Sequence, residues 1–224
     1  MQAAFNIPDN RKHLITTDRE AIADKSIFLA KKFYIMHILN NEGVPCDKYK
    51  IMGVELKKSN SSEFLKYGVW ECAQHIFADG DEEGLRSIIS RLKDEFYDAP
   101  LEEIGTPVSY KSLKKYMDIY EQTESFKGLY WTAKGAIQYN HMRTMNDPPI
   151  NPGDKGYIFY VRGMQANTLA FPLDHPIPEW AEDVTFDRDR MWDNVHKAIH
   201  GYMKAVGWDF KKKKEAKREE LFGF

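Results

Sequence analysis

Three lysine clusters stand out because each combines adjacent lysines with a hydroxyl-bearing or aromatic neighbour. They are Lys31, Lys32 and Tyr34 around Phe33, then Lys57, Lys58 and Ser59, and finally Lys114, Lys115 and Tyr116. Ammonium groups neutralise phosphates, while serine and tyrosine hydroxyls hydrogen-bond to phosphate oxygens and fix the register along a nucleic-acid strand. One such cluster is more often a solvated surface. Three in one chain make binding to the DNA backbone an equal alternative.

Acidic and imidazole side chains give a weaker chemical signal. Asp18 and Glu20 would face the same side of a strand, and two-metal phosphoryl transfer needs paired carboxylates. A solvated strand face is the favoured alternative for this pair taken alone. His196 and His200 have a metal-compatible spacing without a third ligand. The sequence has no nucleophile elbow, zinc-protease motif or glycine-rich phosphate loop, so we expect no catalytic or metal site within this chain.

The composition is that of a globular protein with separated charges. Of its 224 residues, 42% are apolar, and the net charge is −2. Segments 11–60 and 211–218 are basic, whereas 61–105 is acidic. Cys46 and Cys72 are isolated, which argues against a disulfide framework and fits a reducing cytoplasm. No apolar run could cross a membrane and the N-terminus does not resemble a signal peptide, so no membrane partner is expected.

Hydrophobic periodicity predicts an α+β fold. Segments 25–39 and 48–56 are predicted strands of a hairpin, with a turn at 40–47. Asn60 and Asp79, each followed three residues later by a glutamate, are predicted to begin two helices. The remaining predicted elements are helices at 110–120 and 133–145, short strands at 157–162 and 168–171, and a last helix that stops at Gly207.

The predicted strands within residues 1–58 have too few partners to cover their apolar side chains. Two strands alone form a marginal sheet. We therefore expect this segment to complete the sheet of another protein. Residues 59–210 are predicted to form a mainly helical domain with a small β insertion, followed by a tail at 211–224.

An ordered series of motifs resembles a known family. HLITTDREAI, AKKFY and KIMGVELKKSN are followed by IGTPVSYKSLKKY, KGLYWTAKGAIQYNHM, GDKGYIFYVR, NTLAFP and AVGWDF. The series covers nearly the whole chain. It resembles the C-terminal part of the palm and the thumb of family B DNA polymerases, above all the replicative enzymes of tailed bacteriophages. The resemblance implies that 1–58 is the end of the palm, 59–210 the thumb, and 211–224 a basic linker with a clamp-binding peptide.

The resemblance also implies roles for individual residues. Lys31, Lys32 and Tyr34 match a motif that holds the primer strand near its 3′ end. Lys57, Lys58 and Ser59 match a duplex-facing stretch at the palm–thumb junction. The thumb residues implied to grip the product duplex are Lys114, Lys115, Tyr116, Lys134, Tyr139 and Asn140. Asp18 and Glu20 match carboxylates that lie near, but not among, the essential metal ligands.

The sequence departs from the family pattern in several places. Phe33 stands where the family usually has a basic residue, and Thr132-Ala133-Lys134 keeps only the positive charge of the usual His-Val-Arg. The catalytic aspartate motifs DxxSLYPS and DTDS are absent, as are the fingers and the exonuclease. The resemblance therefore implies a split polymerase, in which a larger chain supplies the exonuclease, the fingers and the catalytic palm, and Mg²⁺ acts in the assembled enzyme. A fragment of one longer chain and a stand-alone thumb-derived DNA-binding protein are the alternatives.

The last residues of the sequence suggest a further partner. Leu221, Phe222 and Phe224 follow the basic run at 211–214. A few apolar anchors on a short peptide can supply most of the energy of docking into a pocket. Phage replicative polymerases end in an apolar peptide that docks on the sliding clamp, so the resemblance implies clamp binding. Folding back onto the body of the chain is the alternative.

Overall fold

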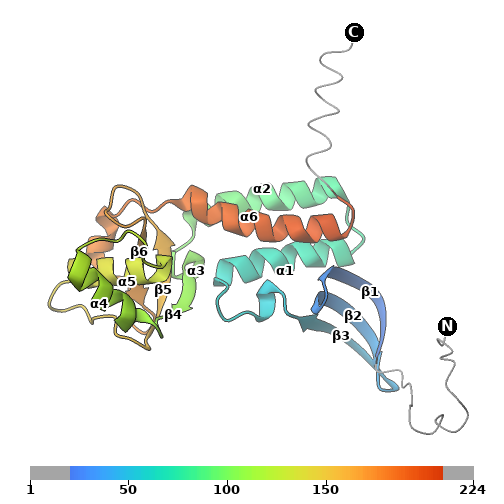
Figure 1. Cartoon of the computed structure of the whole chain (residues 1–224). Helices are drawn as coiled ribbons and strands as arrows, with labels where there is room; N and C mark the ends of the chain where they lie inside the picture. The colour runs from blue at the N-terminus through green and yellow to red at the C-terminus, as the bar shows by residue number, and fades with distance from the viewer. Residues whose placement is uncertain (1–20, 209–224) are drawn as a thin grey trace, which may run out of the picture.

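A computed structural model describes residues 21–208, which fold as a mixed α+β protein with two antiparallel sheets of three strands each. In Figure 1 the first sheet lies below a layer of three long helices, and a second lobe lies at one end of that layer. The prediction of an α+β fold is confirmed. Within the described residues, no helix combines the length and apolar character needed to cross a membrane.

The first sheet is an antiparallel meander of β1 Ala21–Ala30, β2 Phe33–Asn41 and β3 Val44–Met52. The expectation of a single strand over 25–39 is wrong, because the chain reverses at Lys31 and Lys32. No glycine or asparagine marks this turn in the sequence. Instead Lys32 itself takes a left-handed conformation, with a φ of 66°. The predicted hairpin therefore becomes a sheet of three strands.

The second turn of this sheet is shorter than the predicted turn at 40–47. Glu42 and Gly43 have φ values of 53° and 87°, the left-handed pair that suits a two-residue hairpin turn. The Asn40 side-chain oxygen accepts a hydrogen bond from the Gly43 N–H at 2.9 Å. Residues 44–47 consequently belong to β3.

The pleat of the first sheet sorts its apolar side chains onto two faces. Ile27 and Ile35 pair across β1 and β2 and are buried in the core shared with the helices. The adjacent cross-strand row consists of Phe28, Tyr34 and Met52. Successive residues of a strand point to opposite faces, so this row lies on the face away from the helices. Phe28 is 58% exposed and Met52 is 40% exposed.

The helical layer consists of α1 Glu63–Phe77, α2 Glu82–Asp98 and α6 Arg188–Ala205 (Figure 1). Along α2, Leu85, Ile89, Leu92 and Phe96 recur at helical spacing, and all four are buried. The helix α6 ends as predicted, because Gly207 has a φ of 82° and its N–H donates to the Lys204 carbonyl at 3.1 Å.

The predicted starts of α1 and α2 are each two residues too early. Ser62, not Asn60, is the N-cap of α1, and its hydroxyl accepts a hydrogen bond from the Leu65 N–H at 3.2 Å. Asp81, not Asp79, caps α2 in the same way through the Gly84 N–H at 2.8 Å. Each turn contains more than one residue able to cap, so the path of the backbone decides which one does.

The second lobe, called the outer lobe below, contains the second sheet. Its elements are α3 Leu101–Ile104, β4 Thr106–Ser109, α4 Leu113–Thr123, α5 Trp131–Met142, β5 Lys155–Tyr160, β6 Thr168–Pro172 and the short 3₁₀ helix η3 Glu179–Asp183. A second 3₁₀ helix, η2 Glu55–Lys57, lies outside this lobe, between β3 and α1. The sequence does not predict β4, which is short and contains Pro107. Proline is tolerated there because β4 is an edge strand.

Polar contacts join the outer lobe to the helical layer at the first turn of α6. The Arg162 guanidinium, just after β5, lies 2.6 Å from Asp187 and 3.0 Å from Asp189. The Tyr97 hydroxyl of α2 also donates to Asp189. Arg188 donates to the backbone carbonyl of Phe96 at 2.9 Å. The Arg162 contacts fix the outer lobe against the start of α6, and the other two contacts join α6 to α2.

Candidate nucleic-acid interface

The first lysine cluster occupies the tight turn between β1 and β2. Lys31 and Lys32 form the turn, and both side chains are exposed. Phe33 begins β2 and is 39% exposed. Tyr34 is half-buried, with its ring centroid 5.6 Å from that of Phe28. The turn therefore presents two cations and an aromatic ring at one end of the first sheet.

A close backbone approach brings the second lysine cluster to the same end of the sheet. Gly53 has a φ of 68°, and a Cβ atom on it would lie 2.3 Å from the Lys32 carbonyl oxygen. After Gly53 the buried Val54 leads into η2, so Lys57, Lys58 and Ser59 follow close to the turn. Lys58 Nζ lies 5.4 Å from the Phe33 ring centroid. The structure thus joins two clusters that are separate in the sequence.

We call Lys31, Lys32, Lys57 and Lys58 the basic turn. Lys31, Lys32 and Lys57 are exposed, and Lys58 is half-buried, as is Glu55, whose carboxylate pairs with it. Four ammonium groups with a neighbouring hydroxyl at Ser59 suit contacts to several phosphates of a nucleic-acid backbone. Such contacts depend on the shape of the backbone and carry no sequence information.

A buried tyrosine supports the basic turn from behind. Lys58 Nζ lies 3.1 Å from one oxygen of Glu55, and the Tyr202 hydroxyl donates to the other oxygen at 3.1 Å. Tyr202 is on α6 and its side chain is fully buried. Burial, assisted by the nearby Glu55 carboxylate, raises the pKa of Tyr202, so the hydroxyl keeps its proton and remains a donor. Sequence reasoning missed Glu55 and Tyr202, because they are 147 residues apart.

The third lysine cluster lies elsewhere, on α4 of the outer lobe. Lys114 and Lys115 are exposed and Tyr116 is half-buried. Lys115 Nζ lies 5.8 Å from the Tyr116 ring centroid. In Figure 1 the helix α4 lies at the far end of the molecule from the first sheet. The structure therefore does not merge this cluster with the basic turn.

A small cavity beside α4 adds hydroxyl groups to this part of the outer lobe. It has a volume of about 240 Å³ and is lined in part by Ser109, Lys111, Ser112, Tyr116, Tyr130 and Thr132. Sequence reasoning singled out only Tyr116 of this set. The SYKS run at 109–112, in which two serines flank Tyr110 and Lys111, is the local sequence pattern that indicates these hydroxyl groups.

Two of the three expected thumb residues of α5, Tyr139 and Asn140, make hydrogen bonds within the protein. Lys134 is half-buried. Tyr139 is fully buried, and its hydroxyl donates to the Pro148 carbonyl at 2.9 Å. The Asn140 side-chain amide exchanges two hydrogen bonds of 2.8 Å with the Ile150 backbone. The polar atoms of Tyr139 and Asn140 hold the segment after α5, and their implied contact with DNA stays a prediction.

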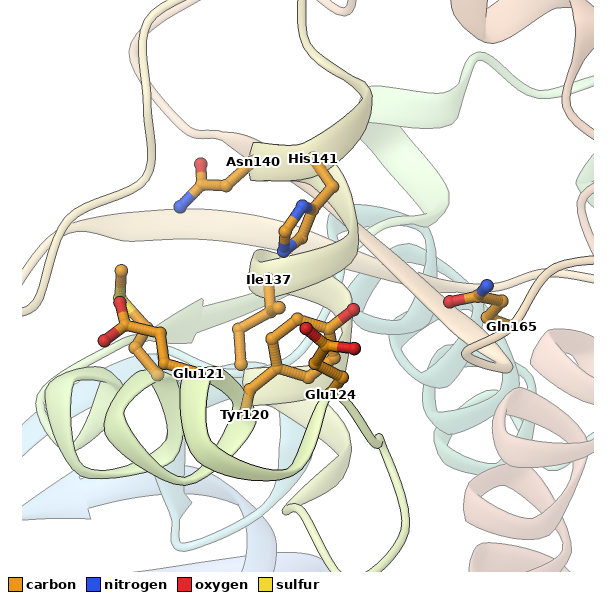
Figure 2. Close-up of a pocket in the computed structure, with 8 residues that line it drawn as sticks. Tyr120, Glu121, Glu124, Ile137, Asn140, His141 and Gln165 are labelled. Atoms are coloured by element: carbon orange, nitrogen blue, oxygen red, sulfur yellow. The ribbon is translucent and has the colours of Figure 1, made fainter.

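A larger cavity of about 590 Å³ lies between α4 and α5 (Figure 2). Figure 2 shows Tyr120 and Glu121 of α4, with Glu124 just after the helix, below Ile137 and His141 of α5. The Tyr120 and His141 ring centroids are 5.2 Å apart. Two carboxylates at its edge repel phosphate, so we do not include this cavity in the candidate interface.

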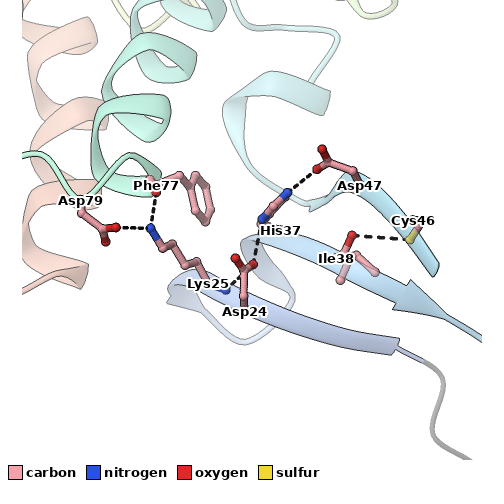
Figure 3. Close-up of polar contacts among 8 residues, drawn as sticks. All are labelled: Asp24, Lys25, His37, Ile38, Cys46, Asp47, Phe77 and Asp79. Atoms are coloured by element: carbon pink, nitrogen blue, oxygen red, sulfur yellow. Dashed lines mark hydrogen bonds and ion pairs between the residues drawn. The ribbon is translucent and has the colours of Figure 1, made fainter.

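Polar contacts also fix the first sheet, which carries the basic turn (Figure 3). His37 on β2 lies between Asp24 at 2.8 Å and Asp47 at 2.6 Å, one on each neighbouring strand. Lys25 Nζ donates to the Phe77 carbonyl at 2.6 Å and to Asp79 at 2.5 Å. The hydrogen bond to Asp47 is the main cause of a raised pKa of His37, with Asp24 adding to it against the opposing effect of burial.

Several expected site residues lie outside the described part of the chain. They are Asp18, Glu20, Leu221, Phe222 and Phe224. Within residues 21–208, no group of three or more histidine, cysteine or acidic side chains is arranged to hold a metal ion. His196 and His200 stack with ring centroids 6.3 Å apart. Burial lowers the pKa of His196, with His200 contributing.

Comparison with known proteins gives one distant similarity, and no family model matches the chain. The chain is 24% identical over 237 aligned positions to a protein described as a DNA-directed DNA polymerase, from Escherichia phage RB69. The alignment covers 96% of this chain and 25% of that polymerase. The chain therefore spans about a quarter of the length of the relative that it matches.

Proposed function

We propose that this chain is the end of the palm and the thumb of a family B DNA polymerase and that it holds primer–template duplex. The observation that carries the proposal is the meeting of two lysine clusters at the basic turn, in a chain similar along 96% of its length to a DNA-directed DNA polymerase. The catalytic carboxylates belong to a larger chain. The present chain therefore acts on DNA by positioning the duplex and makes no bond itself.

The basic turn suits this task because its cations can contact consecutive phosphates of the primer strand. Lys31 and Lys32 are exposed on a two-residue turn, and Lys58, which follows Lys57 in the chain, lies 5.4 Å from the ring centroid of the adjacent Phe33. Holding the duplex fixes the 3′ end relative to an incoming nucleotide, which lowers the entropic part of the barrier. Because phosphates are the main targets, binding should depend on salt and little on base sequence.

The side chains of residues 21–208 do not fit a Mg²⁺ site, since no three histidine, cysteine or acidic side chains among them are grouped so that they could hold a metal ion. We therefore assign the metal-binding carboxylates of the reaction to the larger chain and derive no step of the reaction from this one.

The outer face of the first sheet supports the proposal of a larger chain. The row of Phe28, Tyr34 and Met52 is apolar or aromatic and faces away from the helices. The strands β1 and β3 are both edges of the described sheet. Open edges and an uncovered apolar face are the features that another chain can cover. We propose that the catalytic palm of the larger chain covers this face.

Duplex binding by the full chain tests the proposed function. A labelled primer–template duplex is titrated with the protein at several salt concentrations, and binding is followed by fluorescence anisotropy. The Lys31→Ala/Lys32→Ala variant should bind about tenfold more weakly at low salt, and its slope of log affinity against log salt should fall by about 1.8. The loss should be similar for duplexes of different sequence.

The matched control is Lys197→Ala/Lys204→Ala, which removes the same charge from two exposed positions of α6. This variant should bind almost as the wild-type chain does. Equal losses in the two double variants would show that only the net charge matters and would contradict a specific interface. A loss that depends on duplex sequence would contradict backbone recognition.

We further propose that Leu221, Phe222 and Phe224 dock on the sliding clamp. Deleting residues 221–224 should abolish clamp-stimulated processivity of the assembled enzyme and leave its distributive synthesis intact. Primer extension with and without the clamp, on a long template, measures both quantities. Equal loss of both would contradict a role in clamp binding.

A stand-alone DNA-binding protein is the second candidate function. The observation that favours it is the shared core of the first sheet and the helices, which includes Ile27 and Ile35. Such a core could allow the chain to fold without a partner. The two functions differ in whether a larger polymerase chain accompanies this one in the cell.

A further inference from the structure

Lys58 differs from the other lysines of the basic turn because its ammonium group is held on two sides. One oxygen of Glu55 lies 3.1 Å from Nζ, and the Phe33 ring centroid lies 5.4 Å from it. The Lys58 side chain is 38% exposed and the Glu55 side chain 20% exposed. The lysine is thus anchored while part of its side chain still faces solvent.

The second oxygen of Glu55 is held in turn by the buried core of the helical layer. It accepts a hydrogen bond of 3.1 Å from the Tyr202 hydroxyl. Tyr202 is fully buried on α6, so its position is fixed by packing. With both oxygens engaged, the Glu55 side chain can occupy few orientations, and this also restricts the Lys58 side chain that it contacts.

We infer that Phe33, Glu55 and Tyr202 are positioning residues that hold Lys58 ready to contact a duplex phosphate. The inference rests on the proposed function. A free lysine loses rotamer freedom when it binds, whereas an anchored lysine has already lost most of it, so less affinity is sacrificed on binding. The same contacts link the basic turn to α6.

This role gives a physical reason for a carboxylate within a phosphate-binding surface. Glu55 repels phosphate, and its charge also offsets that of Lys58. Its hydrogen bond to the buried Tyr202 directs the carboxylate toward the protein interior, and the Phe33 ring is a second neighbour of the ammonium group. A cation near an aromatic ring keeps its charge available to a further partner.

Double-mutant cycles on duplex binding by the full chain test the inference. Lys58→Ala should weaken binding about fivefold at low salt and reduce the salt slope by about 0.9. Phe33→Leu and Tyr202→Phe leave every charge in place, yet each should weaken binding about two- to threefold. Combined with Lys58→Ala, neither should weaken binding further, because the lysine that they position is gone.

Phe33→Tyr is the conservative replacement, since it keeps the aromatic face and should recover the affinity that Phe33→Leu loses. Thermal unfolding of each variant shows whether it is folded at the temperature of the binding measurement. Full additivity of Phe33→Leu and Tyr202→Phe with Lys58→Ala would overturn the inference, as would unchanged affinity in both single variants.

The outcome also separates this inference from the proposed function. If Lys31→Ala/Lys32→Ala weakens binding but the cycles are additive, the interface stands and the positioning role is wrong. If neither Lys31→Ala/Lys32→Ala nor Lys58→Ala weakens binding, the proposed function itself is wrong.

Discussion

The basic turn and the lysine cluster of α4 contain similar residue types but are constructed differently. The basic turn joins two segments of chain through the close approach at Gly53, and Lys58 is anchored by Glu55 and Phe33. On α4, Lys114 and Lys115 project from an exposed helix, and Lys115 packs near the neighbouring Tyr116. The comparison suggests that tertiary packing, more than the number of lysines, separates a prepared phosphate-binding surface from a solvated helix face.

Of the substitutions that distinguish the basic turn from the α4 cluster, replacement of Gly53 should change stability and duplex affinity most. Gly53→Ala introduces a side chain in a left-handed conformation and places its Cβ 2.3 Å from the Lys32 carbonyl oxygen. We expect a loss of about 3 kcal/mol or more in the free energy of unfolding. Because the two segments must move apart, duplex affinity should also fall. Chemical denaturation and anisotropy measure the two effects.

Gly128→Ala in the outer lobe is the control for backbone strain alone. Gly128 has a φ of 80°, but a Cβ there would meet no atom within 4 Å. We expect a loss of about 1–2 kcal/mol and unchanged duplex affinity. Equal destabilisation by the two substitutions would show that the close approach at Gly53 contributes nothing.

The α4 lysines should contribute less than the basic turn to duplex binding. Lys114→Ala/Lys115→Ala removes two charges from flexible, exposed side chains, so we expect about a two- to threefold loss of affinity at low salt. This is well below the loss expected for Lys31→Ala/Lys32→Ala. Side-by-side titrations at one salt concentration give the ratio. A larger loss from the α4 variant would reverse the comparison and place the main contact in the outer lobe.

The smallest predicted effect is on the pH dependence of stability, which should differ in direction between His37 of the first sheet and His196 of α6. The pKa of His37 is raised by Asp47 and Asp24, so its stabilising contribution is complete below the ordinary value of 6.5 and is lost as the pH rises through the raised pKa. Burial lowers the pKa of His196, so the folded chain keeps this imidazole neutral at pH values where the unfolded chain protonates it. Stability is therefore lost as the pH falls below 6.5 toward the lowered pKa.

Variants of the two histidines should therefore flatten opposite sides of the stability profile. Thermal midpoints measured between about pH 5 and 9 should fall less on the alkaline side for His37→Asn than for the wild-type chain. For His196→Asn, the acid side should be the flatter one. The same change in both variants would show that neither assignment of direction is correct.

The sequence predicts the helices better than the sheets, for physical reasons. Helical spacing identifies the buried face of α2 through Leu85, Ile89, Leu92 and Phe96, because that pattern is local. The turn at Lys31 and Lys32 escapes prediction because a lysine adopts the left-handed conformation without a glycine signal. The strand β4 escapes because it is short and tolerates Pro107 only as an edge strand.

The candidate interface divides in the same way. Its lysines are visible in the sequence as clusters, but the meeting of Lys32 with Gly53 depends on the register of the sheet. The hydrogen bond between Tyr202 and Glu55 joins residues 147 positions apart, which no local pattern indicates. Tyr139 belongs to a matching motif, and the structure adds that its side chain is buried and donates to the Pro148 carbonyl, which no local pattern indicates.

The proposal that this chain works together with a larger polymerase chain is tested most directly by recovering the tagged chain from cells that make the native replication proteins. The recovered material is analysed by mass spectrometry and is then assayed for primer extension. If this chain is part of a split polymerase, an equal amount of a larger polymerase chain that carries the catalytic aspartate motifs should be recovered with it, and extension should weaken when Lys31→Ala/Lys32→Ala replaces the wild-type chain. Recovery without such a chain, or extension that is indifferent to these two lysines, would contradict the proposal.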